Sequence, residues 1–455
     1  MKKIKMMMAA ALGVLVSCGS VKSGEEAIAA SRESKVVVAY VTSWSEVMPD
    51  PQYMTHINYA FGHVNESFNG VKIDNEERLR QIVDLRKQKP ELKVLLSIGG
   101  WGSGRFSEMA ANDEYRRAFA ADCDRVVKEF ALDGIDIDWE YPTSSMANIS
   151  SSPDDTENFT LLMQDIRAAI GNEKELTLAT VASARYIDFK AILPSVDFVN
   201  IMAYDMASAP KHHSALYPSG HSGDITSDGA VTAHLKAGVP PSKLVMGMPF
   251  YGRGGDGYPS FQDYNKVGNT DTQYTEKWDE VAQVPYLADK NDTLVFGFEN
   301  PRSLAIKCQY ILDKDLLGGM YWDYSGDNEQ GDLRRTVAEN LLGKPHKAKV
   351  LVLTERGGQH GGFTDAGLRW LAAEGVKGNF SITEINNAKP ITETYLSQFN
   401  LIIQLDYPPY TWPKEAEDAF VKYIEEGKGG WIGFHHATLL GEFDGFPLWQ
   451  WFSDF

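Results

Sequence analysis

The sequence predicts an α/β protein in which a (β/α)8 barrel, the TIM-barrel architecture, is followed by a smaller open α/β domain. Eight short, β-branched apolar runs alternate with helix-like stretches between Val36 and Tyr324, as in a barrel of parallel strands. Polar and aromatic residues gather where these runs end, which is where a barrel carries its chemistry. The alternation resumes after a Gly- and Pro-containing break at residues 343–347. A doubly wound sheet also fits the alternation, but the clustering at the strand ends favours the barrel.

The expected barrel strands follow one another with amphipathic segments between them. Two of these segments, E-E-R-L-R-Q-I-V from Glu76 and D-E-Y-R-R-A-F-A from Asp113, carry the helical period. The strands are V-V-V-A-Y-V from Val36, H-I-N-Y-A-F-G-H-V from His56, K-V-L-L-S-I-G-G from Lys93, G-I-D-I-D-W-E-Y from Gly134, L-T-L-A-T-V-A from Leu176, F-V-N-I-M-A-Y-D from Phe198, L-V-M-G-M-P-F-Y from Leu244 and G-G-M-Y-W-D-Y from Gly318. Their C-terminal ends bring Ser97, Trp101, Glu140, Tyr141, Tyr204, Asp205, Tyr251 and Trp322.

The second domain is expected to contain a sheet of the open type. Its strands are K-V-L-V-L-T from Lys349, F-S-I-T-E-I from Phe380, N-L-I-I-Q-L-D from Asn400 and G-G-W-I-G-F-H-H-A from Gly429. The final P-L-W-Q-W-F-S-D-F is an apolar end of the kind that more chain normally covers, so we expect this domain to be partial. The domain prediction is a barrel over residues 35–343 and the partial domain over 348–455.

The N-terminus predicts export. A basic start precedes an apolar stretch from Met6 to Val16, too short to span a bilayer and typical of a signal peptide over residues 1–18. The L-V-S-C that ends it resembles the lipobox of bacterial lipoproteins, which implies a lipid on Cys18; an ordinary secretory peptide cleaved elsewhere is the alternative. Residues 19–34 form a polar tether. We therefore expect a lipoprotein of the bacterial cell envelope, in the outer membrane or the periplasm, held to the membrane by its anchor.

The amino-acid composition indicates which classes of molecule the protein is expected to bind. A net charge of -18 repels phosphate backbones, which argues against nucleic acid. Twenty Tyr, ten Trp and twenty-one Phe offer flat faces for sugar rings, although most are expected in the core. Cys123 and Cys308 are far apart in sequence and predict two buried thiols rather than a disulfide. No Cys or His cluster has zinc spacing, so no metal is expected, and we expect a monomer.

The segment D-G-I-D-I-D-W-E-Y-P, from Asp133 to Pro142, places three acids at alternate positions. On a strand, Asp136, Asp138 and Glu140 share one face, and the apolar residues between them point the other way. Crowded carboxyls resist joint ionisation, so at least one pKa must rise. A solvated acidic loop is the alternative, and it fits poorly with the β-forming and large apolar residues in between. The pattern predicts a row of catalytic carboxyls.

The order of the three acids indicates their roles in glycoside hydrolysis. Glu140 lies nearest the mouth of the barrel, where a carboxylic acid with a raised pKa protonates a leaving oxygen. Asp138 lies beneath it and is expected to share a proton or hydrogen bond with it, while Asp136 balances the charge from below. A carboxylate directly below the acid is badly placed to attack the opposite face of a sugar. This favours the substrate-assisted route, in which the 2-acetamido oxygen of the sugar attacks the anomeric carbon.

The segment matches the D-x-x-D-x-D-x-E signature and resembles family 18 of the glycoside hydrolases, the chitinase family. Further family-like blocks follow in order: S-I-G-G-W from Ser97, M-A-Y-D from Met202, F-Y-G-R from Phe250 and Y-W-D-Y-S-G-D from Tyr321. The likeness runs from Lys35 to Leu342. It implies that Glu140 is the acid and base, that Asp138 positions the acetamide with support from Asp136, and that Tyr204 donates a hydrogen bond to the acetamide oxygen. No cofactor is implied.

A further set of residues is expected to contact the sugar. Trp322 is expected to form the floor of the subsite where the bond breaks, and Asp205 to line the same subsite. Packing roles are the alternative for Met202, Trp101 and Tyr251, and small residues such as Ser97, Gly99 and Gly100 are expected to be structural. The full set of predicted substrate-binding residues is Tyr40, Phe61, Trp101, Tyr141, Met202, Asp205, Tyr251, Arg253 and Trp322.

The resemblance implies a retaining enzyme acting on N-acetylglucosamine-containing polysaccharides or glycans. The segment between F-Y-G-R and Trp278 looks too short for the small α+β domain that many chitinases insert there, so we expect a shallow, open cleft and endo cleavage of β-1,4-linked chains. An endo-β-N-acetylglucosaminidase acting on N-glycans is the first alternative. A lectin-like protein that binds chitin without cutting it is the second, and such proteins typically lack the acid that Glu140 provides.

The C-terminal region carries a separate resemblance. K-V-L-V-L-T-E with His360, and then W-I-G-F-H-H-A, are similar to the ThuA-like trehalose-utilisation domains, relatives of the class I glutamine amidotransferases. G-F-H-H-A occupies the place of the amidotransferase nucleophilic Cys, so that chemistry is absent. His435 and His436 are candidates for binding a sugar or a metal, with simple packing and hydrogen bonding as the alternative.

Overall fold

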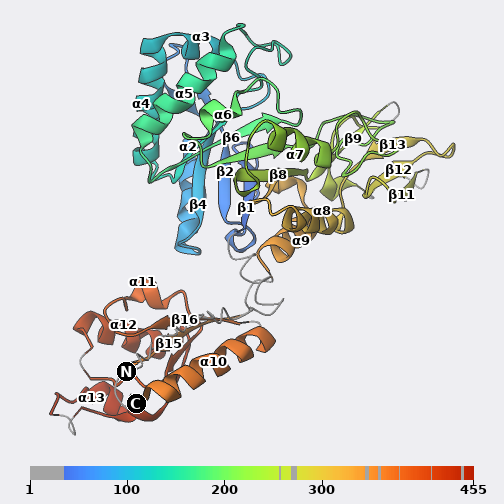
Figure 1. The fold of residues 1–455 in the computed structure, drawn as a ribbon. Helices are drawn as coiled ribbons and strands as arrows, with labels where there is room; N and C mark the ends of the chain where they lie inside the picture. The colour runs from blue at the N-terminus through green and yellow to red at the C-terminus, as the bar shows by residue number, and fades with distance from the viewer. Residues whose placement is uncertain are drawn as a thin grey trace, which may run out of the picture.

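The eight predicted barrel strands all form, and they close into a parallel barrel (Figure 1). This computed structural model describes residues 35–255, 258–267, 274–343, 348–356, 360–378, 380–410, 412–441 and 445–455. The signal peptide, the tether, Cys18 and residues 344–347 of the expected linker lie outside the described residues. The strand order is β1-β14-β8-β7-β6-β5-β4-β2, and pairing of β1 with β2 completes the ring. The barrel prediction is therefore confirmed, and the doubly wound alternative is excluded.

The barrel strands and the helices around them follow each other along the chain. The strands are β1 (Val36–Thr42), β2 (His56–Val64), β4 (Lys93–Gly99), β5 (Gly134–Asp138), β6 (Glu175–Val181), β7 (Phe198–Met202), β8 (Leu244–Pro249) and β14 (Gly318–Trp322), with the short β3 (Val71–Ile73) antiparallel to β2. The helices are α2 (Glu76–Val83), α3 (Phe106–Ala111), α4 (Asp113–Glu129), α5 (Asp155–Ile170), α6 (Phe189–Ile192), α7 (Ser227–Lys236), α8 (Pro301–Asp313) and α9 (Asp332–Leu341).

Alternation along each strand separates two layers of core. On β1, Val37 and Ala39 belong to the large cluster between strands and helices, while Val38 and Tyr40 belong to a smaller cluster that includes Met320. On β5, Ile135 packs in the outer layer and the carboxyls take the inner positions. Because side chains alternate along a strand, the apolar residues of β5 pack between the strands and the helices, and the carboxyls of the acid row point into the barrel interior.

Helix ends show why these segments begin where they do. Asn112 caps α4 by accepting hydrogen bonds from the N–H groups of Glu114 and Tyr115. Asn300 and Ser303 form a reciprocal capping box at the start of α8, with Pro301 in the first turn. Cys123 on α4 and Cys308 on α8 are buried free thiols, as predicted. Among the described helices, none has the length and apolar character to cross a bilayer.

A small antiparallel sheet follows β8, in the segment that was expected to be too short for an inserted α+β domain and to leave the cleft open, and its residues Tyr251 and Arg253 line the cavity. Its strand order is β10-β9-β13-β12-β11, and it lies at one side of the barrel (Figure 1). That expectation rested only on the residues up to Trp278, whereas β13 returns to pair with β9 and β12 pairs with β11 and β13. Antiparallel strands need only short turns, so a sheet fits where an α+β domain does not. The strands are β9 (Tyr251–Gly254), β10 (Gln262–Asp263), β11 (Thr275–Asp279), β12 (Val284–Ala288) and β13 (Leu294–Gly297).

The C-terminal domain is an open, parallel α/β sheet, as predicted. Its strand order is β16-β15-β17-β18, and buried apolar clusters lie on both faces of the sheet. The strands are β15 (Ala348–Leu353), β16 (Phe380–Ile385), β17 (Leu401–Gln404) and β18 (Gly430–Gly433), and the helices are α10 (Gly361–Gly378), α11 (Glu393–Leu396), α12 (Lys414–Glu425) and α13 (Gln450–Asp454).

Candidate active site

The three acids of the row follow β5 outward in increasing order of solvent access, with Asp136 and Asp138 on the strand and Glu140 two residues beyond its end. Asp136 is fully buried, Asp138 is 4% exposed and Glu140 is 9% exposed. The Asp136 carboxylate accepts four hydrogen bonds, which hold it in place at the base of the row. The donors are the hydroxyls of Tyr40 (2.8 Å), Ser97 (2.8 Å) and Thr177 (2.6 Å) and the amide of Asn200 (3.3 Å).

Burial is the main reason that the pKa values of the row rise. It raises the pKa of Glu140 to about 7, and the negative charge of Asp205 adds to this, while a hydrogen bond with Tyr141 opposes it. Burial also raises the pKa of Asp138 well above its usual range, with further contributions from the charges of Glu140 and Asp136. Oδ1 of Asp138 has no hydrogen-bond partner among the described residues. The row therefore resists full ionisation, and Glu140, with a pKa of about 7, keeps a substantial protonated fraction near neutral pH.

Two glycines on the neighbouring strand allow the row to be packed this closely. Gly99 has φ +133°, and a Cβ there would lie 2.0 Å from the carbonyl oxygen of Asp138. At Gly100, with φ +93°, a Cβ would lie 2.7 Å from the ring of Phe61. The N–H of Gly100 donates to the Asp138 carbonyl at 2.9 Å. Gly99 and Gly100 are therefore structural, as expected, because a side chain at either position would clash with the neighbouring chain and strain the backbone.

Above the row lies a cavity of about 880 Å³ at the C-terminal ends of the strands. Every residue predicted to bind substrate lines it, together with Asp138, Glu140 and Tyr204; Asp136 lies beneath and does not. The hydroxyl of Tyr204 donates to the sulfur of Met320 at 3.8 Å, and sulfur is a weak acceptor. The hydroxyl of Tyr204 can therefore donate its hydrogen bond to a stronger acceptor on a bound ligand.

Aromatic rings form one wall of the cavity around Trp322. Its ring stacks on Phe61, with centroids 5.5 Å apart and an interplanar angle of 21°, and lies 5.6 Å from Tyr40. Trp101 is 62% exposed and meets Tyr141 edge-on, so it lies at the rim. The flat indole of Trp322 is thus held by rings from β1 and β2 before any ligand arrives.

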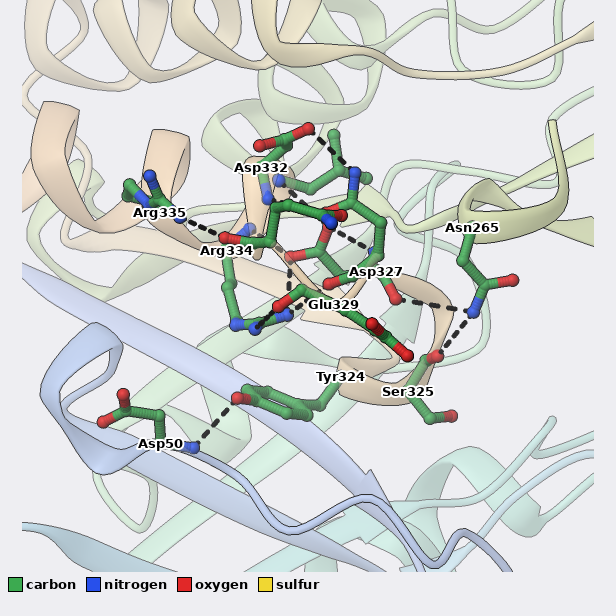
Figure 2. Close-up of polar contacts among 12 residues, drawn as sticks. Asp50, Asn265, Tyr324, Ser325, Asp327, Glu329, Asp332, Arg334 and Arg335 are labelled. Atoms are coloured by element: carbon green, nitrogen blue, oxygen red, sulfur yellow. Dashed lines mark hydrogen bonds and ion pairs between the residues drawn. The ribbon is translucent and has the colours of Figure 1, made fainter. Parts of the chain in front are cut away.

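The loop that follows Trp322 is held by a buried carboxylate (Figure 2). Asp327 accepts hydrogen bonds from the N–H groups of Asn328 (2.8 Å), Leu333 (3.1 Å) and Arg334 (2.9 Å) and pairs with the Arg334 guanidinium at 3.1 Å. In the same loop, the hydroxyl of Tyr324 accepts the N–H of Asp50 at 2.9 Å. These contacts anchor the chain immediately beyond the aromatic wall.

Asp205 and Arg253 form a second wall, and in the strand order only β8 separates β7, which precedes Asp205, from β14, which carries Trp322. The guanidinium donates two hydrogen bonds of 2.6 Å to the two carboxylate oxygens. Burial would raise the pKa of Asp205, but Arg253 and His213 lower it well below its usual range, so Asp205 stays ionised. This ion pair joins the end of β7 to strand β9 of the small sheet. Tyr251 of the same strand stacks on Phe261 at 4.7 Å and extends the wall.

Several lining residues were not predicted from the sequence. Trp44 follows β1 and is 64% exposed, which repeats the pattern of Trp101 after β4 and could have been recognised. Tyr186 stacks on Tyr141 at 5.5 Å, a contact between two loops that no local pattern indicates. The full set of missed aromatic, charged and methionine side chains in the lining is Trp44, Met146, Arg185, Tyr186, Met206 and Phe261.

The second domain brings together polar residues at the ends of its strands. The imidazole of His436, just beyond β18, lies 4.4 Å from that of His360, and its Nδ1 is 3.5 Å from Glu355. The side chain of His435 lies outside the described part of the chain. The sequence singled out His360 and His436 separately, and the fold makes them neighbours.

Comparison with known families and structures agrees with this geometry. Residues 36–327 match the model of the glycosyl hydrolases family 18, and residues 349–455 match that of trehalose utilisation, ThuA. The first match spans most of the chain and includes both walls of the cavity.

Similar proteins include Chitinase A1 of Niallia circulans, 29% identical over 67% of this chain and 58% of the relative, so this chain spans less than two thirds of that protein. Chitotriosidase-1 of Mus musculus is 31% identical over 65% of this chain and 74% of its own length. A solved family 18 N-acetylglucosaminidase from Paenibacillus barengoltzii is 32% identical with a TM-score of 0.63, covering 67% of this chain and 99% of that one.

Proposed function

This chain belongs to family 18 of the glycosyl hydrolases, and we propose that it is a retaining endo-acting chitinase that cleaves β-1,4-linked N-acetylglucosamine chains with help from the substrate's own acetamido group. The relatives named as chitinases support the substrate class. The observation that carries the mechanism is the raised pKa of Glu140, about 7, beside a cavity in which no other described carboxylate is placed as a nucleophile.

The other acids of the cavity lining are Asp138 and Asp205. Asp138 is on the same strand, two residues below Glu140, and Asp205 is paired with Arg253 through both oxygens. A classical retaining pair needs a free carboxylate about 5 Å away across the sugar. The attacking oxygen therefore comes from the substrate.

In the proposed reaction, the sugar ring lies on Trp322 and its 2-acetamido oxygen attacks the anomeric carbon. Glu140 donates its proton to the leaving glycosidic oxygen as that bond breaks. Asp138 accepts a hydrogen bond from the acetamide N–H and stabilises the positive charge of the oxazolinium ion, while Tyr204 donates to the acetamide oxygen. Glu140, now a carboxylate, then deprotonates a water molecule that attacks the anomeric carbon and opens the oxazolinium ring. The anomeric carbon is inverted twice, so its configuration is retained overall.

Product analysis tests the substrate class. The full chain is incubated with chitohexaose and, separately, with a high-mannose glycopeptide, and the products are identified by mass. Internal cleavage of chitohexaose with the glycopeptide intact is the expected result. Cleavage of the glycopeptide core alone would replace the proposal with an endo-β-N-acetylglucosaminidase. Release of single N-acetylglucosamine units alone would replace endo cleavage with N-acetylglucosaminidase activity, the activity for which the Paenibacillus barengoltzii protein is named.

A separate experiment tests the mechanism. A thiazoline that mimics the oxazolinium ion is expected to inhibit competitively, and a substrate with a free 2-amino group is expected to resist hydrolysis. Equal rates with and without the N-acetyl group would exclude the substrate-assisted route while leaving the glycoside hydrolase assignment intact.

We also infer that the chain is exported and lipid-anchored at Cys18. The basic start, the short apolar stretch and L-V-S-C support this. Metabolic labelling with a radioactive fatty acid is expected to label the wild-type chain and not the Cys18→Ser variant. Labelling that persists in the variant would contradict the anchor.

A further inference from the structure

Two histidines and an aspartate meet behind the wall formed by Asp205 and Arg253. His212 and His221 lie in the connection between β7 and α7, and Asp279 ends strand β11 of the small sheet. One ligand atom from each lies within 4.8 Å of the others. Nε2 of His212 is 3.2 Å, and Nδ1 of His221 is 3.9 Å, from the same oxygen of Asp279, Oδ2. From these contacts we propose that His212, His221 and Asp279 form a zinc site that clamps this connection to the small sheet.

The separations fit a tetrahedral ion. Zinc binds imidazole nitrogen and carboxylate oxygen at about 2.0–2.2 Å, which places neighbouring ligand atoms about 3.4 Å apart in a tetrahedron. The separations of the two histidine nitrogens from Oδ2 of Asp279, 3.2 and 3.9 Å, lie on either side of that value, and all three ligand atoms lie within 4.8 Å of one another. A set of two nitrogens and one oxygen suits zinc better than calcium or magnesium, which prefer oxygen ligands alone.

The protein also holds the ligands in place by other contacts. The N–H of His212 donates to the carbonyl oxygen of His221 at 2.7 Å, so the backbone itself keeps the two histidines together. Oδ1 of Asp279 accepts the N–H groups of Val281 and Ala282, each at 2.9 Å, which orients Oδ2 towards the imidazoles. The hydroxyl of Ser219 donates to Oδ2 at 2.8 Å. Such outer contacts are typical of metal sites, where they reduce the cost of ordering the ligands.

The exposed fractions of the three side chains show that the proposed site is open to solvent on one side, where a water molecule can be the fourth ligand. The side chain of His212 is 1% exposed, that of Asp279 is 10% exposed and that of His221 is 46% exposed. An ion can therefore enter past His221, and a water molecule can complete the tetrahedron from the same side. Three protein ligands and one water is a common arrangement for zinc.

The site is next to the active-site wall but is not part of it. His213 follows His212 in the chain, and its Nδ1 lies 3.5 Å from Asp205. None of the three proposed ligands lines the cavity. The ion therefore stabilises the wall from behind and takes no part in the reaction.

Zinc binding to the full chain, purified without a polyhistidine tag and stripped with a chelator, tests the inference. Zinc is titrated against a chromophoric competitor, and thermal unfolding is recorded with and without zinc. We expect the wild type to bind zinc, with a rise in Tm that saturates at one equivalent from this site. His221→Ala and Asp279→Asn are each expected to weaken that binding at least tenfold and to remove the rise in Tm. Magnesium is expected to have no effect.

Two matched variants separate this site from other histidines. His63 pairs with Asp74 at 3.0 Å but belongs to no group of three ligands in the described part of the chain, so His63→Ala should bind zinc like the wild type. His436→Ala removes the histidine pair of the second domain and should likewise leave the saturating rise in Tm unchanged. Absence of zinc binding by the wild type would overturn the inference, as would binding that survives in His221→Ala or is lost only in His436→Ala.

Discussion

Arg253 and Asp205 face each other in two parallel hydrogen bonds of 2.6 Å, one to each carboxylate oxygen. The pair crosses from strand β9 of the small sheet to the end of β7, and it keeps a negative charge fixed near Glu140. Charge-assisted bonds in this fork geometry are among the strongest that side chains make. The wall of the cavity thus also influences the protonation of the proposed acid.

Removing that charge should change the pH dependence of catalysis. Burial and the charge of Asp205 both raise the pKa of Glu140, to about 7, and the protonated form is the one that donates. Activity should therefore be lost as the pH rises through this pKa. Asp205→Asn removes a negative charge that raises the pKa of Glu140, and it leaves the positive charge of Arg253 without its partner. Both changes lower the pKa of Glu140, so the alkaline limb of the pH profile of kcat/KM should move to lower pH by up to about one unit. Asp154→Asn, an exposed acid outside the cavity lining, should leave the profile unchanged, and an upward shift in Asp205→Asn would contradict the argument.

Replacement of the proposed acid should depend on the leaving group. Glu140→Gln should lower kcat by roughly 10²–10⁴-fold on a methylumbelliferyl chitobioside, because a positioned general acid contributes about that much. The loss in the bond-breaking step should be smaller with a dinitrophenyl glycoside, whose leaving group needs no proton. Binding, followed by tryptophan fluorescence, should survive. Turnover at the wild-type rate would remove Glu140 from the mechanism.

Trp322 and Trp101, two of the three tryptophans that line the cavity, should behave differently when each is replaced by alanine. Trp322 is stacked on Phe61 in the cavity lining, and in the proposed reaction its loss removes the flat face on which the sugar lies. By analogy with the cost of losing an aromatic stacking partner, about 1–3 kcal/mol, Trp322→Ala should lower kcat/KM roughly 5- to 150-fold on chitobiosides as well as on longer chains. Trp101→Ala, at the exposed rim, should affect only longer chains. Equal losses on short substrates would contradict these positions.

The buried carboxylate behind Trp322 predicts a stability effect (Figure 2). Asp327→Ala leaves three backbone N–H groups without their acceptor and removes the ion-pair partner of Arg334, at a cost of about 3 kcal/mol in the free energy of unfolding. The midpoint of urea unfolding of the barrel should fall accordingly. Glu329→Ala, at an exposed position of the same loop, should leave the midpoint within error of the wild type. A stable Asp327→Ala variant would show that other contacts hold the loop.

Much of the barrel was predictable because its signals are local. An alternation of two along β5 turns Ile135 outward and Asp136 inward whatever the rest of the chain does, and the polar and aromatic residues at the strand ends follow from the same alternation. The five family blocks lie at such strand ends, so the candidate residues could be named by position.

The small sheet was not predictable in this way. Its strands are short, β13 pairs with β9, which lies about 40 residues before it in the chain, and only the complete set of pairings shows that the strands form one sheet. The stack of Tyr186 on Tyr141 escaped prediction for the same reason, since it joins two loops that are separate in sequence.

The sequence by itself therefore determined the eight barrel strands, the acid row and the aromatic strand ends, because each rests on the geometry of a single strand. Only the tertiary structure decided that Asp205 meets Arg253 and that His212 and His221 meet Asp279. Those residues lie in separate connections, and contacts between such segments depend on how the elements pack rather than on any local period.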